Sequence, residues 1–124
     1  NIGVIDSQDA LIGNKAYDLA SLIDDVRFKT NVSFKNKIFK AFIKNQKKIN
    51  KKKFKNDFEI LSVLRNLKII GIFTRLAIRD GKVKYLKLIP HAWKLISLRI
   101  KKNTVFNDLD NLLSKNFKRE LNAN

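Results

Sequence analysis

The chain has 124 residues, enough for one domain or a piece of one, and 44% of them are hydrophobic, which is ordinary for a globular protein and too high for a disordered tail. Its 27 lysine and arginine residues outnumber 11 aspartate and glutamate residues, so the formal net charge is +16. The absence of cysteine excludes disulfides, cysteine-based zinc sites and thiol nucleophiles, and the single histidine, His91, excludes a multi-histidine metal site.

The longest apolar run, residues 69–73, is far shorter than the roughly 20 residues that a membrane span requires. No signal-peptide pattern opens the chain, so we expect a cytoplasmic protein without membrane contact. The chain also begins with an apolar run and without methionine, which predicts a fragment whose start lies upstream.

The first predicted element is a short β-strand at residues 2–5, which ends at Asp6. Residues 7–14 are predicted to form a loop, because glycine and asparagine at its end favour a turn. The apolar residues of the segment 16–27 recur at helical spacing, which predicts an amphipathic helix there.

A second helix is predicted to begin near Ser33 and to lose its pattern in a lysine run. The third and longest predicted helix covers residues 57–79 and is apolar around most of its circumference, which indicates a buried central helix. Gly71 lies in its middle, where a close packing contact would explain a residue that costs about 1 kcal/mol relative to alanine. Gly81 is expected to end this helix in the left-handed conformation.

Pro90 is typical of the first turn of a helix and predicts a fourth one, which carries Trp93, Ile96 and Ile100. A fifth helix is predicted from five apolar residues that share one face. These are Phe106, Leu109, Leu112, Leu113 and Phe117.

The lysine run, residues 44–55, has seven lysines in twelve positions and could bind nucleic acid or another anionic surface. The simpler interpretation, which we favour, is a solvated connection between helices in a lysine-biased sequence. Of two further candidates, His91 is expected to have a packing or capping role, and residues 75–82 to form a capped helix end with paired charges.

Three carboxylates, Asp6, Asp9 and Asp18, cluster within thirteen residues of this basic chain. A carboxylate at the end of a buried strand is a common ligand of Mg²⁺, which requires oxygen ligands on a rigid platform. Turn or N-cap roles would explain Asp9 and Asp18 equally well, but they explain Asp6 less well. Spacing alone leaves the metal site and its alternative open.

A resemblance favours the metal site. The motifs are GVIDSQDALIG at 3–13, AYDLASL at 16–22, RNLKIIGIFTRL at 65–76, RDGK at 79–82 and IPHAW at 89–93. They resemble the aminoglycoside phosphotransferase and choline kinase-like family, within it the bacterial subgroup that phosphorylates the cell-wall amino sugars N-acetylmuramate and N-acetylglucosamine at the anomeric carbon. The resemblance covers most of the chain from residue 2 to about residue 100.

The resemblance implies a mainly α fold of one short strand and about five helices, which forms the C-terminal portion of a kinase-like α+β C-lobe. Residues 1–124 would then be a C-terminal fragment of an ATP- and Mg²⁺-dependent phosphotransferase. Asp6 matches the aspartate that binds the metal at the nucleotide phosphates. Asp18 matches an aspartate that braces the catalytic loop from a helix start, and Gln8 and Asp9 belong to the same motif.

The chain departs from the family at Ser7, where phenylalanine is usual, and at residues 14–15, where proline is common. No glycine-rich phosphate loop, nucleotide-binding lysine strand or His-Gly-Asp catalytic segment occurs in it. We therefore expect no catalytic base in this chain and no activity from it alone.

The predicted function is the C-terminal part of an amino-sugar kinase, whose partners are a small hydroxylated substrate and the upstream part of the same protein. Two alternatives remain: a basic helical module that binds nucleic acid without sequence specificity, and a truncated kinase lobe without catalysis.

Overall fold

The computed structural model describes residues 7–46 and 50–122, and for residues 7–14 it describes the backbone alone. Within these ranges the chain forms α-helices and short 3₁₀ helices but no β-strand, so the predicted mainly α class is confirmed. The predicted strand at residues 2–5 lies outside the described residues. The elements are α2 (Ser7–Ile23), α3 (Val32–Lys44), α4 (Lys51–Asp80), η1 (Val83–Leu88), α5 (Ile89–Ile100), η2 (Thr104–Phe106) and α6 (Asn107–Asn122).

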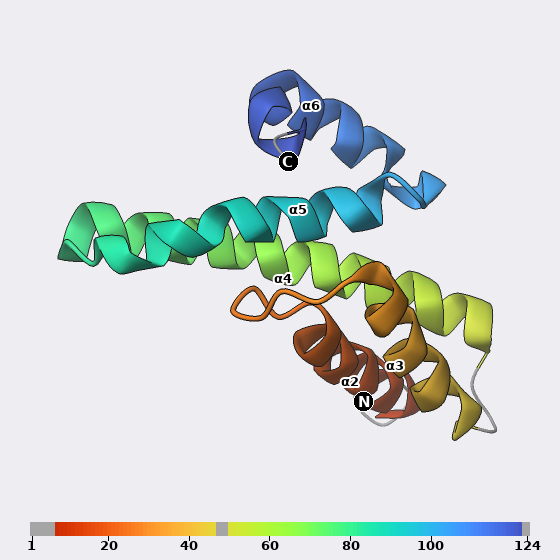
Figure 1. Cartoon of the computed structure of the whole chain (residues 1–124). Helices are drawn as coiled ribbons and strands as arrows, with labels where there is room; N and C mark the ends of the chain where they lie inside the picture. The colour runs from red at the N-terminus through yellow and green to blue at the C-terminus, as the bar shows by residue number, and fades with distance from the viewer. Residues whose placement is uncertain (1–6, 47–49, 123–124) are drawn as a thin grey trace.

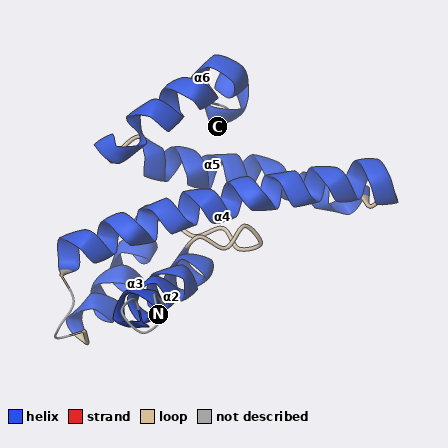
Figure 2. Ribbon diagram, turned by 180° about the vertical axis from the view of Figure 1, so that it is seen from behind, coloured by secondary structure: helices blue, strands red, loops and turns tan. Residues whose placement is uncertain are grey.

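The described helices form three layers (Figure 1). Helices α2 and α3 lie on one side of the long helix α4, which pairs with α5, and α6 lies on α5 on the opposite side. The view from behind shows the same order of helices and the all-helical character of the described chain (Figure 2).

Helix α2 differs from the prediction at both ends. It begins at Ser7, so the predicted loop at residues 7–14 is wrong, and it ends at Ile23 rather than near Arg27. A single glycine costs a helix only about 1 kcal/mol, which explains why Gly13 does not interrupt it. The helix ends where the Asp25 carboxylate accepts a hydrogen bond from the Arg27 amide at 2.9 Å, because this side chain offers the backbone a turn in place of the next helical bond.

The lysine run is only in part a connection between helices, although its described lysines are exposed, as our preferred interpretation expects. Lys44 ends α3, and Lys51 begins α4. The Asn50 side chain accepts a hydrogen bond from the amide of Lys53 at 3.1 Å, and this N-cap allows a helix to start among lysines. Helix α4 therefore begins six residues earlier than predicted.

Helix α4 is the longest helix of the described chain, as predicted, but it is not buried all round. Its buried residues all lie between Phe54 and Asn66. Its second half extends with η1 and the start of α5 away from α2 and α3 (Figure 1), and Ile78 there is 82% exposed. The close packing contact predicted at Gly71 is also absent. Apart from the backbone of α4 itself, no described atom lies within 4 Å of a Cβ placed at this position.

The helix end predicted at Gly81 and the helix start predicted at Pro90 are both confirmed. Gly81 has a φ of 68°, and the amide of Lys82 bonds the carbonyl of Leu76 at 3.0 Å, which closes the end of α4. Pro90 lies in the first turn of α5. Helix α6 is interrupted at Phe117, whose φ and ψ of −134° and 35° are not helical, so the predicted single apolar face is wrong there.

Two hydrophobic clusters form the core. The first, between α2, α3 and the start of α4, contains Ala16, Leu19, Ala20, Ile23, Ile43, Phe54 and Phe58. The second, between α4, α5 and α6, contains Val63, Trp93, Ile96, Ile100, Phe106, Leu113 and Leu121. Because α4 contributes to both, it is the element on which the two halves of the described fold meet.

Candidate functional site

The predicted metal site falls largely outside the described residues. Asp6 lies outside them, one position before the first residue of α2. Gln8 and Asp9 lie in the first turn of α2, where only the backbone is described. Because that backbone is helical, the turn alternative for Asp9 is wrong.

Asp18 is described and lies on an exposed part of α2. It lies eleven residues after the helix start, so both the N-cap alternative and the expected position at a helix start are wrong. The contact that would brace a catalytic loop is not tested by these residues and stays a prediction.

The described side chains do not fit a metal or nucleotide–metal complex on their own. Among them, no group of three or more histidine, aspartate or glutamate residues is arranged to hold a metal ion. The metal role expected of Asp6 is not tested by these residues and stays a prediction. A separate search of the described helices finds none that is long and apolar enough to cross a membrane.

The most buried polar cluster is one that the sequence analysis did not single out. Asp24 follows α2 and is fully buried. Its carboxylate accepts hydrogen bonds from Arg99 of α5, at 2.7 Å from Nε and 3.0 Å from Nη2, and from the Ser62 hydroxyl of α4. Lys35 of α3 completes the cluster, with its Nζ 3.2 Å from Asp24 Oδ1 and 2.6 Å from the carbonyl of Ile23.

We call these four residues, Asp24, Lys35, Ser62 and Arg99, the Asp24 cluster. Burial alone would raise the pKa of Asp24, but the hydrogen bonds and charge of Arg99, then the Ser62 hydroxyl and the Lys35 charge, outweigh burial and lower its pKa. Asp24 is therefore ionised at neutral pH. The cluster connects the end of α2 with α3, α4 and α5 through buried hydrogen bonds.

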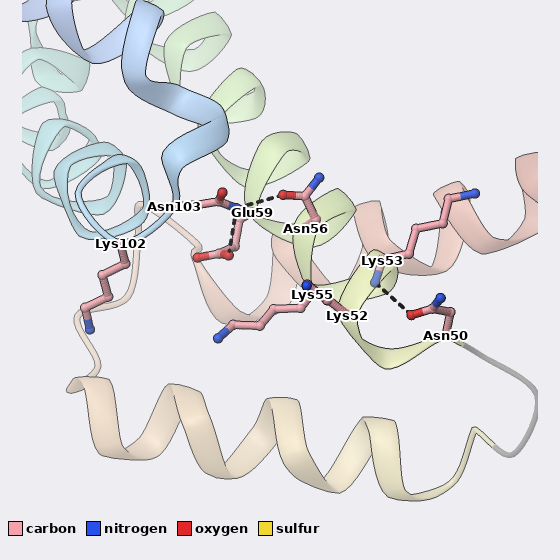
Figure 3. A pocket seen from close by; sticks show the side chains of 8 residues that line it. All are labelled: Asn50, Lys52, Lys53, Lys55, Asn56, Glu59, Lys102 and Asn103. Carbon is pink, nitrogen blue, oxygen red and sulfur yellow. Dashed lines mark hydrogen bonds between the residues drawn. The ribbon is translucent and has the colours of Figure 1, made fainter.

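A second arrangement lies on the surface at the start of α4 (Figure 3). The start of α4 and the connection between α5 and α6 border a hollow of about 450 Å³. We call it the basic hollow, and its lining residues are Asn50, Lys52, Lys53, Lys55, Asn56, Glu59, Lys102 and Asn103.

Asn103 holds the two sides of the basic hollow together. Its side-chain oxygen, Oδ1, accepts a hydrogen bond from the backbone amide of Val105 at 3.0 Å, which caps η2. Its amide nitrogen donates to Asn56 Oδ1 at 2.8 Å and to Glu59 Oε1 at 3.3 Å, both on α4 (Figure 3). Both ends of the Asn103 side chain are therefore bonded, and Asn56, Glu59 and Asn103, which we call the floor of the hollow, are connected to one another.

A neighbouring hollow of about 630 Å³ lies between α3 and α4. It shares Lys52 and Lys55 with the basic hollow, and Phe39 and Ile43 contribute its apolar part. Lysines of the predicted run therefore border both hollows, from the end of α3 to the first two turns of α4.

His91 makes a contact with a segment distant in sequence and does not cap α5. Its Nε2 lies 3.3 Å from the carbonyl oxygen of Phe28, which joins α5 to the segment after α2. Partial burial lowers its pKa despite this contact, and the charges of Lys35, Lys29 and Lys94 act in the same direction. The end of α4 also agrees with its predicted paired charges, since Arg79 Nε lies 3.3 Å from Asp80 Oδ1.

Comparison with known proteins supports the subgroup that the motifs indicated. The chain is similar to proteins named N-acetylmuramate/N-acetylglucosamine kinase. One from Caulobacter vibrioides is 30% identical over 92 residues, which cover 74% of this chain and 25% of that protein. One from Neisseria meningitidis serogroup B is 38% identical over 97 residues, 71% of this chain and 28% of that protein. One from Pseudomonas aeruginosa is 31% identical over 124 residues, 92% of this chain and 36% of that protein.

The chain thus spans about a quarter to a third of the length of the curated relatives it matches. No protein-family model matches it, so the wider aminoglycoside phosphotransferase assignment stays a prediction. No solved structure matches it significantly either, and the kinase-like C-lobe stays a prediction as well.

Proposed function

We propose that this chain is the C-terminal part of an ATP-dependent kinase that phosphorylates an amino sugar of the N-acetylmuramate or N-acetylglucosamine type. The observation that carries the proposal is the shared name of its relatives, which are 30% to 38% identical in three different bacteria. The motifs at 3–13 and 89–93 resemble the same subgroup, which agrees with these names.

Within this proposal Asp6 is the ligand of Mg²⁺. A bound Mg²⁺ supplies charge neutralisation at the nucleotide phosphates during transfer. In the sequence Asp6 directly precedes Ser7, the first described residue of α2. Gln8 and Asp9 are assigned to the same site because they share its motif.

The helices described here would supply the support for that site. The Asp24 cluster ties the end of α2 to three other helices, and α2 is the helix that Asp6 precedes. The orientation of α2 relative to α4 and α5 is thereby constrained by buried hydrogen bonds, as a metal ligand next to it requires.

The catalytic base, the nucleotide-binding lysine and the phosphate loop are assigned to residues upstream of this chain. The chain alone should therefore show no turnover. A longer polypeptide that contains these residues, a His-Gly-Asp segment and the nucleotide-binding part should phosphorylate N-acetylglucosamine or N-acetylmuramate in a coupled ATP assay.

This experiment separates the proposal from the truncated-lobe alternative. If the DNA upstream of Asn1 encodes an initiator codon close by and no such segment, the chain is a lobe without catalysis. If the longer polypeptide exists and consumes ATP with neither amino sugar, the proposed substrate class is wrong.

A further inference from the structure

The basic hollow concentrates positive charge that the proposed kinase site does not use. Between Asp25 and Asp57 the sequence contains twelve basic residues and no acidic one. Four lysines line the hollow itself. Like charges held this close raise the free energy of the folded chain, and a bound anion removes that cost.

Two of these lysines approach from different elements. Lys55 lies on α4, and Lys102 lies in the connection between α5 and α6. Their side chains extend into the same open space beside Glu59 (Figure 3). Neither takes part in an ion pair within the described chain, so both ammonium groups are available to a ligand.

The start of α4 adds to this attraction. The first turn of a helix carries partial positive charge, and acidic residues usually compensate it. The first turn of α4 contains no acidic residue and begins with three lysines, starting at Lys51. The Asn50 side chain accepts a hydrogen bond from the amide of Lys53. The amides of Lys51 and Lys52 have no acceptor within the helix, because the first amides of any α-helix lack one.

The floor of the hollow has a different chemistry. Glu59 is the acidic residue that lines it, and it is only 5% exposed. Its Oε1 accepts from Asn103, and among the contacts of the described residues Oε2 accepts none. A carboxylate at this position repels an anion that carries no donor groups, but it accepts hydrogen bonds from the hydroxyl groups of a ligand. The side-chain amide of Asn56 can donate hydrogen bonds to the same hydroxyl groups.

We propose that the basic hollow binds a small molecule that carries both a phosphate group and several hydroxyl groups, such as a sugar phosphate. The phosphate lies between Lys55 and Lys102, and the hydroxyl groups bond Glu59 and Asn56. The volume of about 450 Å³ is in the range of small-molecule sites. This site shares no residue with the proposed Mg²⁺ site and does not depend on the kinase proposal.

The test is a titration of the isotope-labelled chain followed by NMR, with glucose 1-phosphate, inorganic phosphate and glucose as three separate ligands in 150 mM salt. The side-chain amide signals of Asn56 and Asn103 report directly on the floor of the hollow. We expect both signals to shift with glucose 1-phosphate, and we expect it to bind about tenfold more tightly than inorganic phosphate and glucose.

Two pairs of lysine variants share the same change in net charge. Lys55→Gln with Lys102→Gln should weaken binding of glucose 1-phosphate about tenfold or more, because charge-assisted hydrogen bonds to the phosphate are lost. The control, Lys115→Gln with Lys118→Gln on exposed positions of α6, should leave binding within about twofold. Fluorescence of Trp93 verifies that each variant is folded.

Glu59→Gln tests the role of the floor. It should strengthen binding of inorganic phosphate and reduce the preference for glucose 1-phosphate, since the repulsive charge is removed and the hydroxyl acceptor is weakened.

Three results would overturn the proposal. Equal weakening by both lysine pairs would mean that the overall charge, not the hollow, attracts the ligand. Equal affinity for inorganic phosphate and glucose 1-phosphate would remove the role of the floor. Tighter binding of a single-stranded oligonucleotide than of glucose 1-phosphate at the same amide signals would assign the hollow to a polymer.

Discussion

Removal of the Asp24 carboxylate should be among the most damaging single changes in the described chain. Asp24→Asn keeps the shape of the side chain and removes its charge. Two cations then stay buried without their counterion, because Lys35 is 3% exposed and Arg99 is 9% exposed. The asparagine can still accept a hydrogen bond, but it cannot compensate either charge.

The expected loss is about 4 kcal/mol of unfolding free energy. Breaking a buried ion pair by removal of one partner costs about 3–5 kcal/mol, since an uncompensated buried charge is left behind. Here one carboxylate lies 2.7 and 3.2 Å from two buried cations, which places the effect within that range rather than below it. The total unfolding free energy of a small domain is about 5–15 kcal/mol, so this variant should be partly unfolded at room temperature.

Urea unfolding followed by Trp93 fluorescence is the assay. Trp93 is the single tryptophan, is 6% exposed and lies against Phe117 with a ring separation of 5.2 Å, so its emission reports the packing of α5 and α6. Asp108→Asn, in the exposed first turn of α6, is the matched control and should cost less than about 1 kcal/mol.

The effect should also depend on pH. The pKa of Asp24 is lowered from its ordinary value of 3.8, so its stabilisation is fully present above pH 3.8 and is lost as the pH falls through the lowered value of the folded state. The difference in unfolding free energy between the unchanged chain and Asp24→Asn should therefore be constant near neutral pH and should become smaller in acid.

A second variant makes the reasoning refutable. Addition of Lys35→Met to Asp24→Asn removes one uncompensated cation and should recover part of the lost stability. A loss below about 1 kcal/mol in Asp24→Asn, or further destabilisation by Lys35→Met, would show that the carboxylate does not compensate buried charge.

Three further predictions concern the proposed site and the surface. In the longer polypeptide, Asp6→Ala should lower kcat by orders of magnitude with little change in Tm. Near-normal turnover of this variant in the coupled ATP assay would refute the metal assignment. The isolated chain should associate at high concentration, because Ile78 and Val83 expose 82% and 63% of their surface, and Ile78→Lys should reduce association in sedimentation measurements; a monomer at all concentrations would contradict this. Filter binding at physiological salt should show only weak, salt-dependent affinity for nucleic acid without sequence preference, and a sub-micromolar sequence-selective complex would refute it.

Local signals predicted much of the helical fold. Apolar spacing located α3, α4 and α5, while Gly81 and Pro90 marked helix ends that the structure confirms. The start of α2 was missed because a glycine followed by asparagine is typical of a turn, and here the cost of one glycine is offset by helix on both sides. The exposure of the second half of α4 was missed because apolar composition cannot indicate which neighbours are present to cover it.

The Asp24 cluster could not be predicted from local pattern, since its members are separated by up to 75 residues. A weaker signal was nevertheless present. Ala16, Leu19, Ala20 and Ile23 form the buried stripe of α2, and Asp24 continues that stripe at the spacing of one helical turn from Ala20. Arg99 likewise follows Ile96 by three positions on the buried face of α5. A charged residue on an apolar stripe indicates a buried partner, although it does not identify it.

The lysine run shows why composition and placement must be separated. Its charge can be explained by the excess of lysine throughout the chain, and that explanation led us to favour a solvated connection. Composition does not explain why Lys102 and Asn103, almost fifty residues later, lie beside Lys55. Asn103 holds them there through its bonds to Asn56 and Glu59 on α4, and these contacts depend on how α5 and α6 pack. The fold, not the composition, therefore brings these two distant segments together around one buried carboxylate. A comparison of ligands that differ in shape and in number of hydroxyl groups tests this hollow better than a comparison of ligands that differ only in charge.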